Sequence, residues 1–101
     1  MSRSATSKSG IPVRLTDERW EHIVTEHGEL SGHQVAVLQT VSAPERILAG
    51  TSGEKLAVRE IERGKWLVVV YRESEHDGFI ITAFLTRRYR SLEKREVLWS
   101  P

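Results

Sequence analysis

The chain has 101 residues, no cysteine and a formal net charge of +1. This length supports one domain with its own hydrophobic core, because a chain of this size buries roughly 60–68% of its unfolded surface. The lack of cysteine excludes disulfides, thiolate metal sites and cysteine nucleophiles. The near-neutral total excludes a protein that binds polyanions over its whole surface, although the five basic residues against one acid at 87–95 permit a local phosphate-binding patch.

The first twelve residues predict a disordered lead-in, followed by a single domain at 13–101. This start has no apolar segment of the kind that a secretory signal contains. The longest apolar run, residues 66–71, is far shorter than the roughly 20 residues that a membrane helix needs. Together with the absence of cysteine, these features predict a cytoplasmic protein with no membrane contact.

Two helices are predicted next along the chain. Apolar side chains and a histidine recur at i, i+3, i+4 and i+7 over residues 20–27, which indicates one stripe of an amphipathic helix. Thr16 is placed to cap this helix and Gly28 to end it. A second helix is expected to begin with the capping-box pattern of Ser31 and Gln34 and to end before Pro44.

The rest of the chain predicts strands. Residues 43–50 form at most a short turn of helix, and an alternation of period two then runs through residues 55–62. Further strands are expected at 65–72 and 79–86, with a short last one at 96–99. The order of elements predicts an α+β fold, in which two N-terminal helices pack on one face of an antiparallel sheet of three to four strands.

The strand at 79–86 divides its side chains between two faces of the sheet. One set is wholly apolar and is expected to lie under the helices: Phe79, Ile81, Ala83 and Leu85. The other set carries Thr82 and Thr86 together with Ile80 and Phe84. Each threonine is either a strand-forming residue that bonds locally or a polar group of a functional site.

His27 and a few polar groups on the sheet are the candidates for chemistry. His27 ends the first helix, where it either interacts with the helix dipole or faces a cleft as a half-buried imidazole. Tyr71 is expected opposite Ile80, on the face of Thr82, if the strands pair as Arg72 with Phe79. A two-residue turn before the central strand would place Arg59 opposite Val68 and on the other face from Thr82, so joint action of Arg59 and Thr82 stays open.

No metal site is expected. His22 and His27 lie five residues apart and so do not share a helix face, whereas helical metal ligands are spaced by three or four. The sequence also has no phosphate-binding glycine loop and no nucleophile-elbow motif. We therefore expect a protein without metal or other cofactor.

The order of features resembles a superfamily of small bacterial toxin nucleases that joins barnase, EndoU, colicin-type tRNases and RelE. The resemblance covers residues 14–99: a helix ending in His27-Gly28, a second helix, then VVVYRE at 68–73 and IITAFLTRR at 80–88. It is closest to BrnT-like toxins and to a phage-associated branch, which the RWEHI text at 19–23 resembles. Phe84 stands where BrnT-like toxins carry an arginine.

The resemblance implies a RelE/barnase-like fold and metal-independent cleavage of RNA, either tRNA or mRNA. In such cleavage a 2′-hydroxyl attacks the adjacent phosphate and leaves a 2′,3′-cyclic phosphate. The resemblance implies five catalytic residues: His27, Thr82, Arg59, Arg87 and Tyr71. It implies RNA binding by a further five: His22, Arg72, Thr86, Arg88 and Arg90. A cognate antitoxin or immunity protein is the implied partner.

Two other functions stay open. The same fold could be a non-catalytic module that binds RNA or a protein through the basic segment 87–95. A role in protein interaction alone, through an exposed end at Trp99, is the remaining alternative. The three differ in what they predict for RNA: cleavage, binding without cleavage, or neither.

Overall fold

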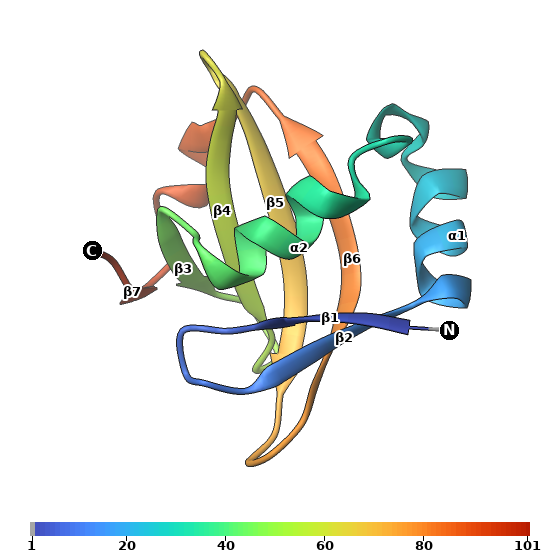
Figure 1. Cartoon of the computed structure of the whole chain (residues 1–101). Helices are drawn as coiled ribbons and strands as arrows, with labels where there is room; N and C mark the ends of the chain where they lie inside the picture. The colour runs from blue at the N-terminus through green and yellow to red at the C-terminus, as the bar shows by residue number, and fades with distance from the viewer. Residues whose placement is uncertain (1) are drawn as a thin grey trace.

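Over residues 2–101, the part of the chain that the computed structural model describes, seven strands form one mixed sheet in the spatial order β1-β2-β6-β5-β4-β3-β7 (Figure 1). The strands are β1 (Ser2–Thr6), β2 (Pro12–Thr16), β3 (Arg46–Ala49), β4 (Lys55–Glu62), β5 (Lys65–Glu73), β6 (Gly78–Thr86) and β7 (Val97–Trp99). The helices are α1 (Asp17–Glu26) and α2 (Gln34–Ser42), and the short 3-10 helices are η1 (Gly28–Leu30) and η2 (Tyr89–Leu92).

The predicted sheet of three to four antiparallel strands is therefore wrong. Two of the additional strands, β1 and β2, occupy part of the segment expected as a disordered lead-in. A third, β3, replaces the short helical turn expected at 43–50. In addition, β2 pairs in parallel with β6, through Val13 with Gly78 and Arg14 with Phe79, so the sheet is mixed.

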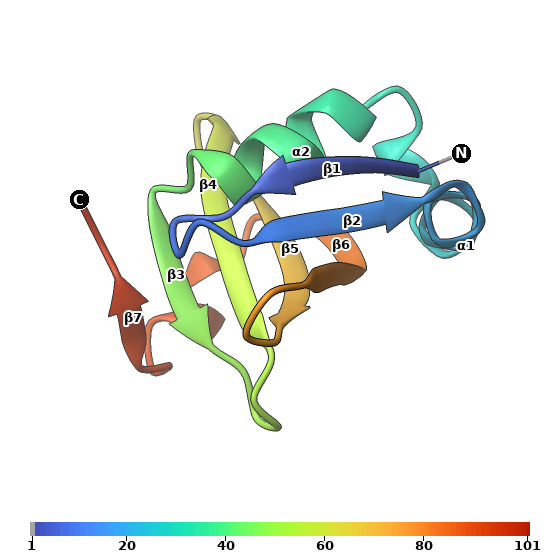
Figure 2. The ribbon, with the colours of Figure 1, turned by 60° about the horizontal axis from the view of Figure 1, so that its bottom comes forward.

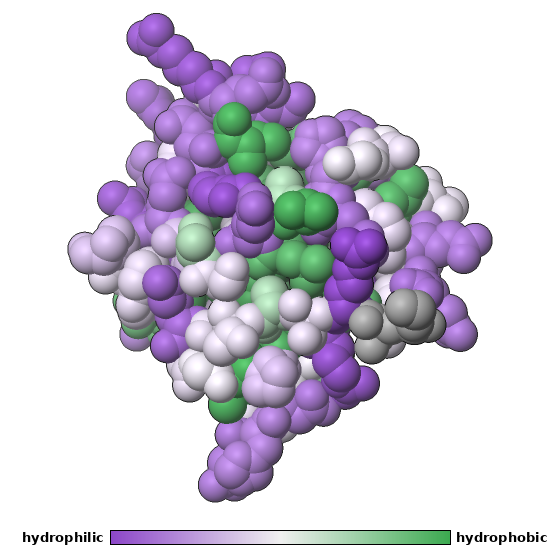
Figure 3. Space-filling view, in the orientation of Figure 1, coloured by the Kyte–Doolittle hydropathy of each residue, from purple (hydrophilic) through white to green (hydrophobic). Residues whose placement is uncertain are grey.

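The β1–β2 hairpin and α2 cover one side of the central strands, which we call the helix side, and α1 lies beside β6 and β2 at the edge of the sheet (Figures 1 and 2). In Figures 1 and 2, α2 and the hairpin run across β4, β5 and β6 on this side. The core enclosed there consists of Val13, Leu15, Ile23, Leu30, Val37, Val41, Ala57, Leu67, Val69, Tyr71, Ile80 and Ala83. Hydrophobic side chains also reach the surface along the middle of this face, between hydrophilic margins (Figure 3).

The opposite side of the sheet, which we call the far side, has a smaller apolar cluster of Leu48, Leu56, Val58, Val68 and Leu92. The cluster is closed by η2, which contributes Leu92 after the chain turns back at the end of β6. Half-buried Val70 and Phe84 extend it toward β6. The far side is thus covered at β3 and β4 and more open at β5 and β6.

A β-bulge in β6 changes the side of the sheet to which its side chains point. Tyr71 pairs with Ile80, as predicted, but the next pair is Val70 with Thr82, so Ile81 is the extra residue. Ile80 is therefore buried on the helix side with Tyr71, and the prediction that it shares a face with Thr82 is wrong. Beyond the bulge, the prediction that Ala83 and Leu85 lie under the helices is confirmed.

The sequence predicts the N-terminal cap of α1 correctly and that of α2 incorrectly. The hydroxyl of Thr16 accepts a hydrogen bond from the backbone N–H of Arg19 at 3.1 Å, so the predicted cap of α1 is confirmed. The predicted capping box of α2 is wrong, because α2 begins at Gln34 after His33, which makes no side-chain capping bond. No helix in residues 2–101 is long and apolar enough to cross a membrane.

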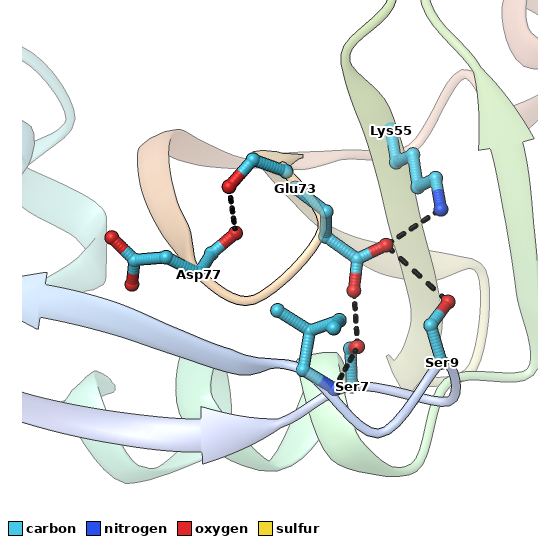
Figure 4. A network of polar contacts seen from close by, with 7 residues as sticks. Ser7, Ser9, Lys55, Glu73 and Asp77 are labelled. Carbon is cyan, nitrogen blue, oxygen red and sulfur yellow. Dashed lines mark hydrogen bonds and ion pairs between the residues drawn. The ribbon is translucent and has the colours of Figure 1, made fainter.

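One largely buried carboxylate ties the β1–β2 hairpin to the sheet (Figure 4). The side chain of Glu73 is 6% exposed and accepts hydrogen bonds from Lys55 Nζ at 2.6 Å, from Ser7 and from Ser9 at 3.4 Å. Burial alone would raise the pKa of Glu73, but the bonds from Lys55 and Ser7, the Lys55 charge and the Ser9 bond together lower it. The ionised carboxylate is thus the form that the folded protein favours.

Candidate functional site

The imidazole of His27 lies at the edge of β6, on the border of the far side. Its backbone N–H donates to the carbonyl of Ile23 at 2.7 Å and closes the last turn of α1. The pairing of β2 with β6 is confined to Gly78 and Phe79, so the rest of that edge of β6 is left to α1. The ring centroids of His27 and Phe84 are 6.2 Å apart, tilted by 39°. A half-buried histidine is therefore held against a side chain of the far side.

Thr82 and Thr86 lie on the same face of β6 as Phe84. Thr82 pairs with Val70 of β5, and Thr86 pairs with Trp66, and all four side chains are half-buried. The hydroxyl of Thr86 accepts a hydrogen bond from the backbone N–H of Arg88 at 3.0 Å. Among residues 2–101, the hydroxyl of Thr82 has no hydrogen-bond partner and is not sealed from solvent, so it is available to a ligand.

A basic segment follows directly after Thr86. The side chains of Arg87, Arg88 and Arg90 are exposed, and they line a depression of about 470 Å³ around η2. Guanidinium groups present a planar fork of donors that matches phosphate oxygens. The structure therefore brings four of the proposed residue positions onto one continuous path, from His27 over Thr82 and Thr86 to Arg87.

Arg59 and Tyr71 do not belong to this path. Arg59 pairs with Leu67, one residue from the expected Val68, because β4 and β5 shift register between Glu60 and Glu62. Its Nη2 atom donates to the carbonyl of Ala36 in α2 at 3.5 Å, on the helix side. The hydroxyl of Tyr71 is fully buried on the same side and has no hydrogen-bond partner among the described residues 2–101, and burial, with the Glu73 charge, raises the pKa of Tyr71. The expectation that Tyr71 shares the face of Thr82 is wrong.

His22 and Arg72 lie on two different elements, α1 and β5. His22 is exposed on α1, with its Nε2 atom 2.8 Å from Oε1 of Glu26. Arg72 is opposite Phe79, before the bulge, and its charge acts on Glu54 in the loop ahead of β4. Arg72 shares the far side with Val70 and Thr82, because Tyr71 beside it faces the helix side, whereas a role of His22 in RNA binding has support from the resemblance alone.

Two aromatic residues near this path are not among the site residues that the sequence predicts. Trp66 and Tyr89 stack with ring centroids 4.2 Å apart and an interplanar angle of 24°. The signal available in the sequence was a tyrosine between arginines at 87–90, since aromatic and basic residues in alternation are typical of nucleic-acid-binding surfaces. The contact with Trp66 had no signal, because Trp66 and Tyr89 are brought together only when the chain turns back over the far side.

Within residues 2–101, no three side chains of His, Asp or Glu are gathered where they could hold a metal ion. No protein-family model, curated protein or solved structure matches the chain.

Proposed function

We propose that the protein is an endoribonuclease that binds RNA along the far side of β6 and uses His27 for proton transfer. The observation that carries the proposal is the contact of the His27 ring with Phe84, on the face that also presents Thr82. Residues from α1 and β6, more than fifty positions apart in the chain, are brought to one edge of the sheet by the fold. The resemblance to small toxin nucleases supplies the reaction that these residue types would perform, which is metal-independent cleavage of RNA.

The reaction transfers a phosphoryl group within the RNA. The 2′-oxygen forms a bond to phosphorus while the bond from phosphorus to the 5′-oxygen breaks. The proton of the 2′-hydroxyl leaves to a base, and the departing 5′-oxygen receives a proton. A histidine can serve at either end of this exchange, because an unperturbed imidazole gains and loses its proton near neutral pH.

The other groups on the path have roles that fit the same step. The free hydroxyl of Thr82 can donate a hydrogen bond to a phosphate oxygen, and the guanidinium of Arg87 can offset the charge that develops on the phosphate. Exposed Arg88 and Arg90 extend the positive surface along the strand of RNA. A toxin-type nuclease also has a neutralising partner protein, and we propose that this partner covers the basic surface.

The test is cleavage of a labelled single-stranded RNA by wild type, His27→Ala and Thr82→Val. Wild type is expected to release 2′,3′-cyclic phosphate and 5′-hydroxyl ends, and His27→Ala to lose roughly 10²–10⁴-fold in rate, as general acid–base catalysis commonly supplies. Thr82→Val keeps the shape of the side chain and removes its hydroxyl, so a smaller loss is expected. His76→Ala is the matched control, because His76 is an exposed histidine in the β5–β6 turn. Equal rates for wild type and His27→Ala would refute the mechanism.

The position of Arg59 favours one second candidate, a module that binds RNA without cleaving it. With Arg59 and Tyr71 on the helix side, two of the five implied catalytic groups are away from His27. This candidate predicts binding that weakens with salt, with log K falling by roughly 0.7 per phosphate contact for each unit of log salt concentration. It also predicts intact RNA at every protein concentration.

A further inference from the structure

A hollow lies on the far side, next to the end of β6. Its volume is about 870 Å³. Six of its lining residues combine two aromatic rings, two carboxylates, one guanidinium and one apolar side chain: Trp66, Tyr89, Glu45, Glu93, Arg46 and Val97. The site proposed above does not use this pocket, and none of these six residues was selected from the sequence.

The aromatic wall of the pocket is fixed in place. Trp66 stacks on Tyr89 at 4.2 Å, and the Tyr89 hydroxyl accepts a hydrogen bond from Arg46 Nη1 at 3.3 Å. Both rings also pack against the far-side cluster, which explains why they are ordered. Yet both stay half-exposed at the pocket, so a flat ligand has a rigid apolar surface to stack on.

The polar groups around this wall differ in availability. One carboxylate oxygen of Glu45 accepts a hydrogen bond from the backbone N–H of Glu60 at 2.8 Å, so Glu45 is held as part of the β3–β4 edge. Glu93 is exposed, with no ion pair among residues 2–101. The pocket therefore offers one free carboxylate as acceptor and one guanidinium as donor beside the aromatic wall.

The pocket lies on the far side, along β6 from the Phe84 ring that His27 contacts. Trp66 is directly opposite Thr86, and Thr86 is two positions beyond Phe84, the residue that His27 contacts. From Phe84 these steps correspond to about 5 Å across the strands and about 7 Å along β6, and the His27 ring lies a further 6.2 Å from the Phe84 ring. An extended RNA strand with its scissile phosphate at His27 and Thr82 thus has a neighbouring base within reach of the pocket.

We infer that this pocket binds an unpaired purine base of the RNA, an inference that rests on the proposed function. Adenine and guanine both present N7 as an acceptor, which an arginine can donate to. Each also carries an amino group that a carboxylate can accept from, beside N7 in adenine and on the opposite edge of the base in guanine. Cytosine and uracil lack N7 and have a smaller face for stacking. The structure assigns Arg46 to N7, Glu93 to the amino edge and the Trp66–Tyr89 wall to the ring.

The test measures binding of the four ribonucleoside monophosphates, GMP, AMP, CMP and UMP, by calorimetry at one salt concentration. Purine nucleotides are expected to bind roughly tenfold more tightly than pyrimidine nucleotides, the effect of about one good hydrogen bond. Arg46→Gln and Glu93→Gln are expected to remove this preference, and Glu75→Gln, an exposed glutamate in the β5–β6 turn, to retain it. Equal affinity of wild type for all four nucleotides would overturn the inference.

A second readout separates this inference from the proposed function. His27→Ala is expected to keep the purine preference while it loses cleavage. Cleavage without any purine preference, in binding or in the mapped cleavage positions, would refute the purine subsite and leave the nuclease intact. Purine binding by a wild-type protein that cleaves no RNA would refute the nuclease and leave the subsite.

Discussion

Ile80 and Thr82 are two positions apart in β6, yet their side chains leave opposite sides of the sheet. Ile80 is 1% exposed in the helix-side core, whereas Thr82 lies on the far side opposite Val70. The extra residue of the bulge, Ile81, produces the switch, and bulges are frequent next to active sites because they redirect side chains. Because of the bulge, the start of β6 contributes to the core, while its second half presents the Thr82 hydroxyl and the Phe84 ring on the far side, the ring beside His27.

The buried hydroxyl of Tyr71 predicts that Tyr71→Phe stabilises the protein. An unpaired buried hydroxyl costs roughly 1–3 kcal/mol, and its removal leaves the ring in place, so we expect a gain of about 1 kcal/mol in the free energy of unfolding. Urea denaturation measures this gain, with Tyr89→Phe as a control that gives up the bond with Arg46. RNA cleavage by Tyr71→Phe is expected to equal that of wild type; a large loss would mean that Tyr71 takes part in the reaction.

Replacement of the largely buried carboxylate, Glu73→Gln, is expected to destabilise the protein. Hydrogen bonds to a charged group contribute roughly 1.5–3 kcal/mol, and the change weakens those from Lys55 and Ser7 together. The same urea experiment measures the loss in the free energy of unfolding. Glu75→Gln changes an exposed glutamate nearby and is expected to have little effect. Equal losses for both variants would contradict the role assigned to Glu73.

The pH dependence of stability follows from the same carboxylate. Because the folded-state pKa of Glu73 lies below its ordinary value of 4.5, its contribution is fully present above that value and is lost as the pH falls through the folded-state pKa. We therefore expect the difference in Tm between wild type and Glu73→Gln to shrink as the pH is lowered from 6 to 3, roughly the range over which a depressed carboxylate becomes protonated. A difference that stays constant over this range would show that the charge of Glu73 is not responsible.

Gly78→Ala is expected to weaken the junction of three strands. A Cβ atom at Gly78 would lie 3.0 Å from the carbonyl oxygen of Arg72 and 3.2 Å from a methyl group of Val13. Overpacking of this kind costs roughly 1–3 kcal/mol, and the backbone oxygen cannot turn away as a side chain can. Gly28→Ala is the matched control, since a Cβ there meets open space. Thermal unfolding should show a lower Tm for Gly78→Ala alone.

The two sides of the sheet predict different effects of two arginine substitutions on cleavage. Arg87→Gln removes a charge from the proposed RNA path and is expected to lower kcat/KM roughly 10-fold or more, as loss of one charge-assisted contact does. Arg59→Gln changes a group that contacts α2 and is expected to leave kcat/KM unchanged. If Arg59→Gln abolishes the proposed cleavage and remains folded by circular dichroism, RNA must reach the helix side.

The parts of the fold that were predictable have long periodic segments. The strands at β4, β5 and β6 were recognised from seven or more residues of strand pattern, and α1 from its apolar stripe and the Thr16 cap. The strands β1 and β3 have five and four residues, and β1 contains one apolar side chain, Ala5, so neither carried a local signal. Their strand conformation depends on pairing with β2 and β4.

The candidate site was predictable only as a set of residue types. The sequence indicates His27 and Thr82, but the bulge at Ile81 decides that Thr82 lies on the far side, next to the Phe84 ring that His27 contacts. Nothing in the run from Ile80 to Thr86 indicates an extra residue. The separation of Arg59 from Thr82 depends in turn on a register shift near Glu60. Single-residue register changes are decided by how the strands pack, which local pattern does not encode.

The parallel pairing of β2 with β6 has a consequence for the order of folding. Val13 and Gly78 are 65 positions apart, whereas β3, β4, β5 and β6 each pair with a neighbour in the chain. Closing the long loop costs entropy before the parallel contacts repay it. The four-stranded meander should therefore form first, and the β1–β2 hairpin should dock last, completing the core that holds α1 and His27 against β6. The proposed site would then be completed only at the final step of folding, after most of the sheet is already in place.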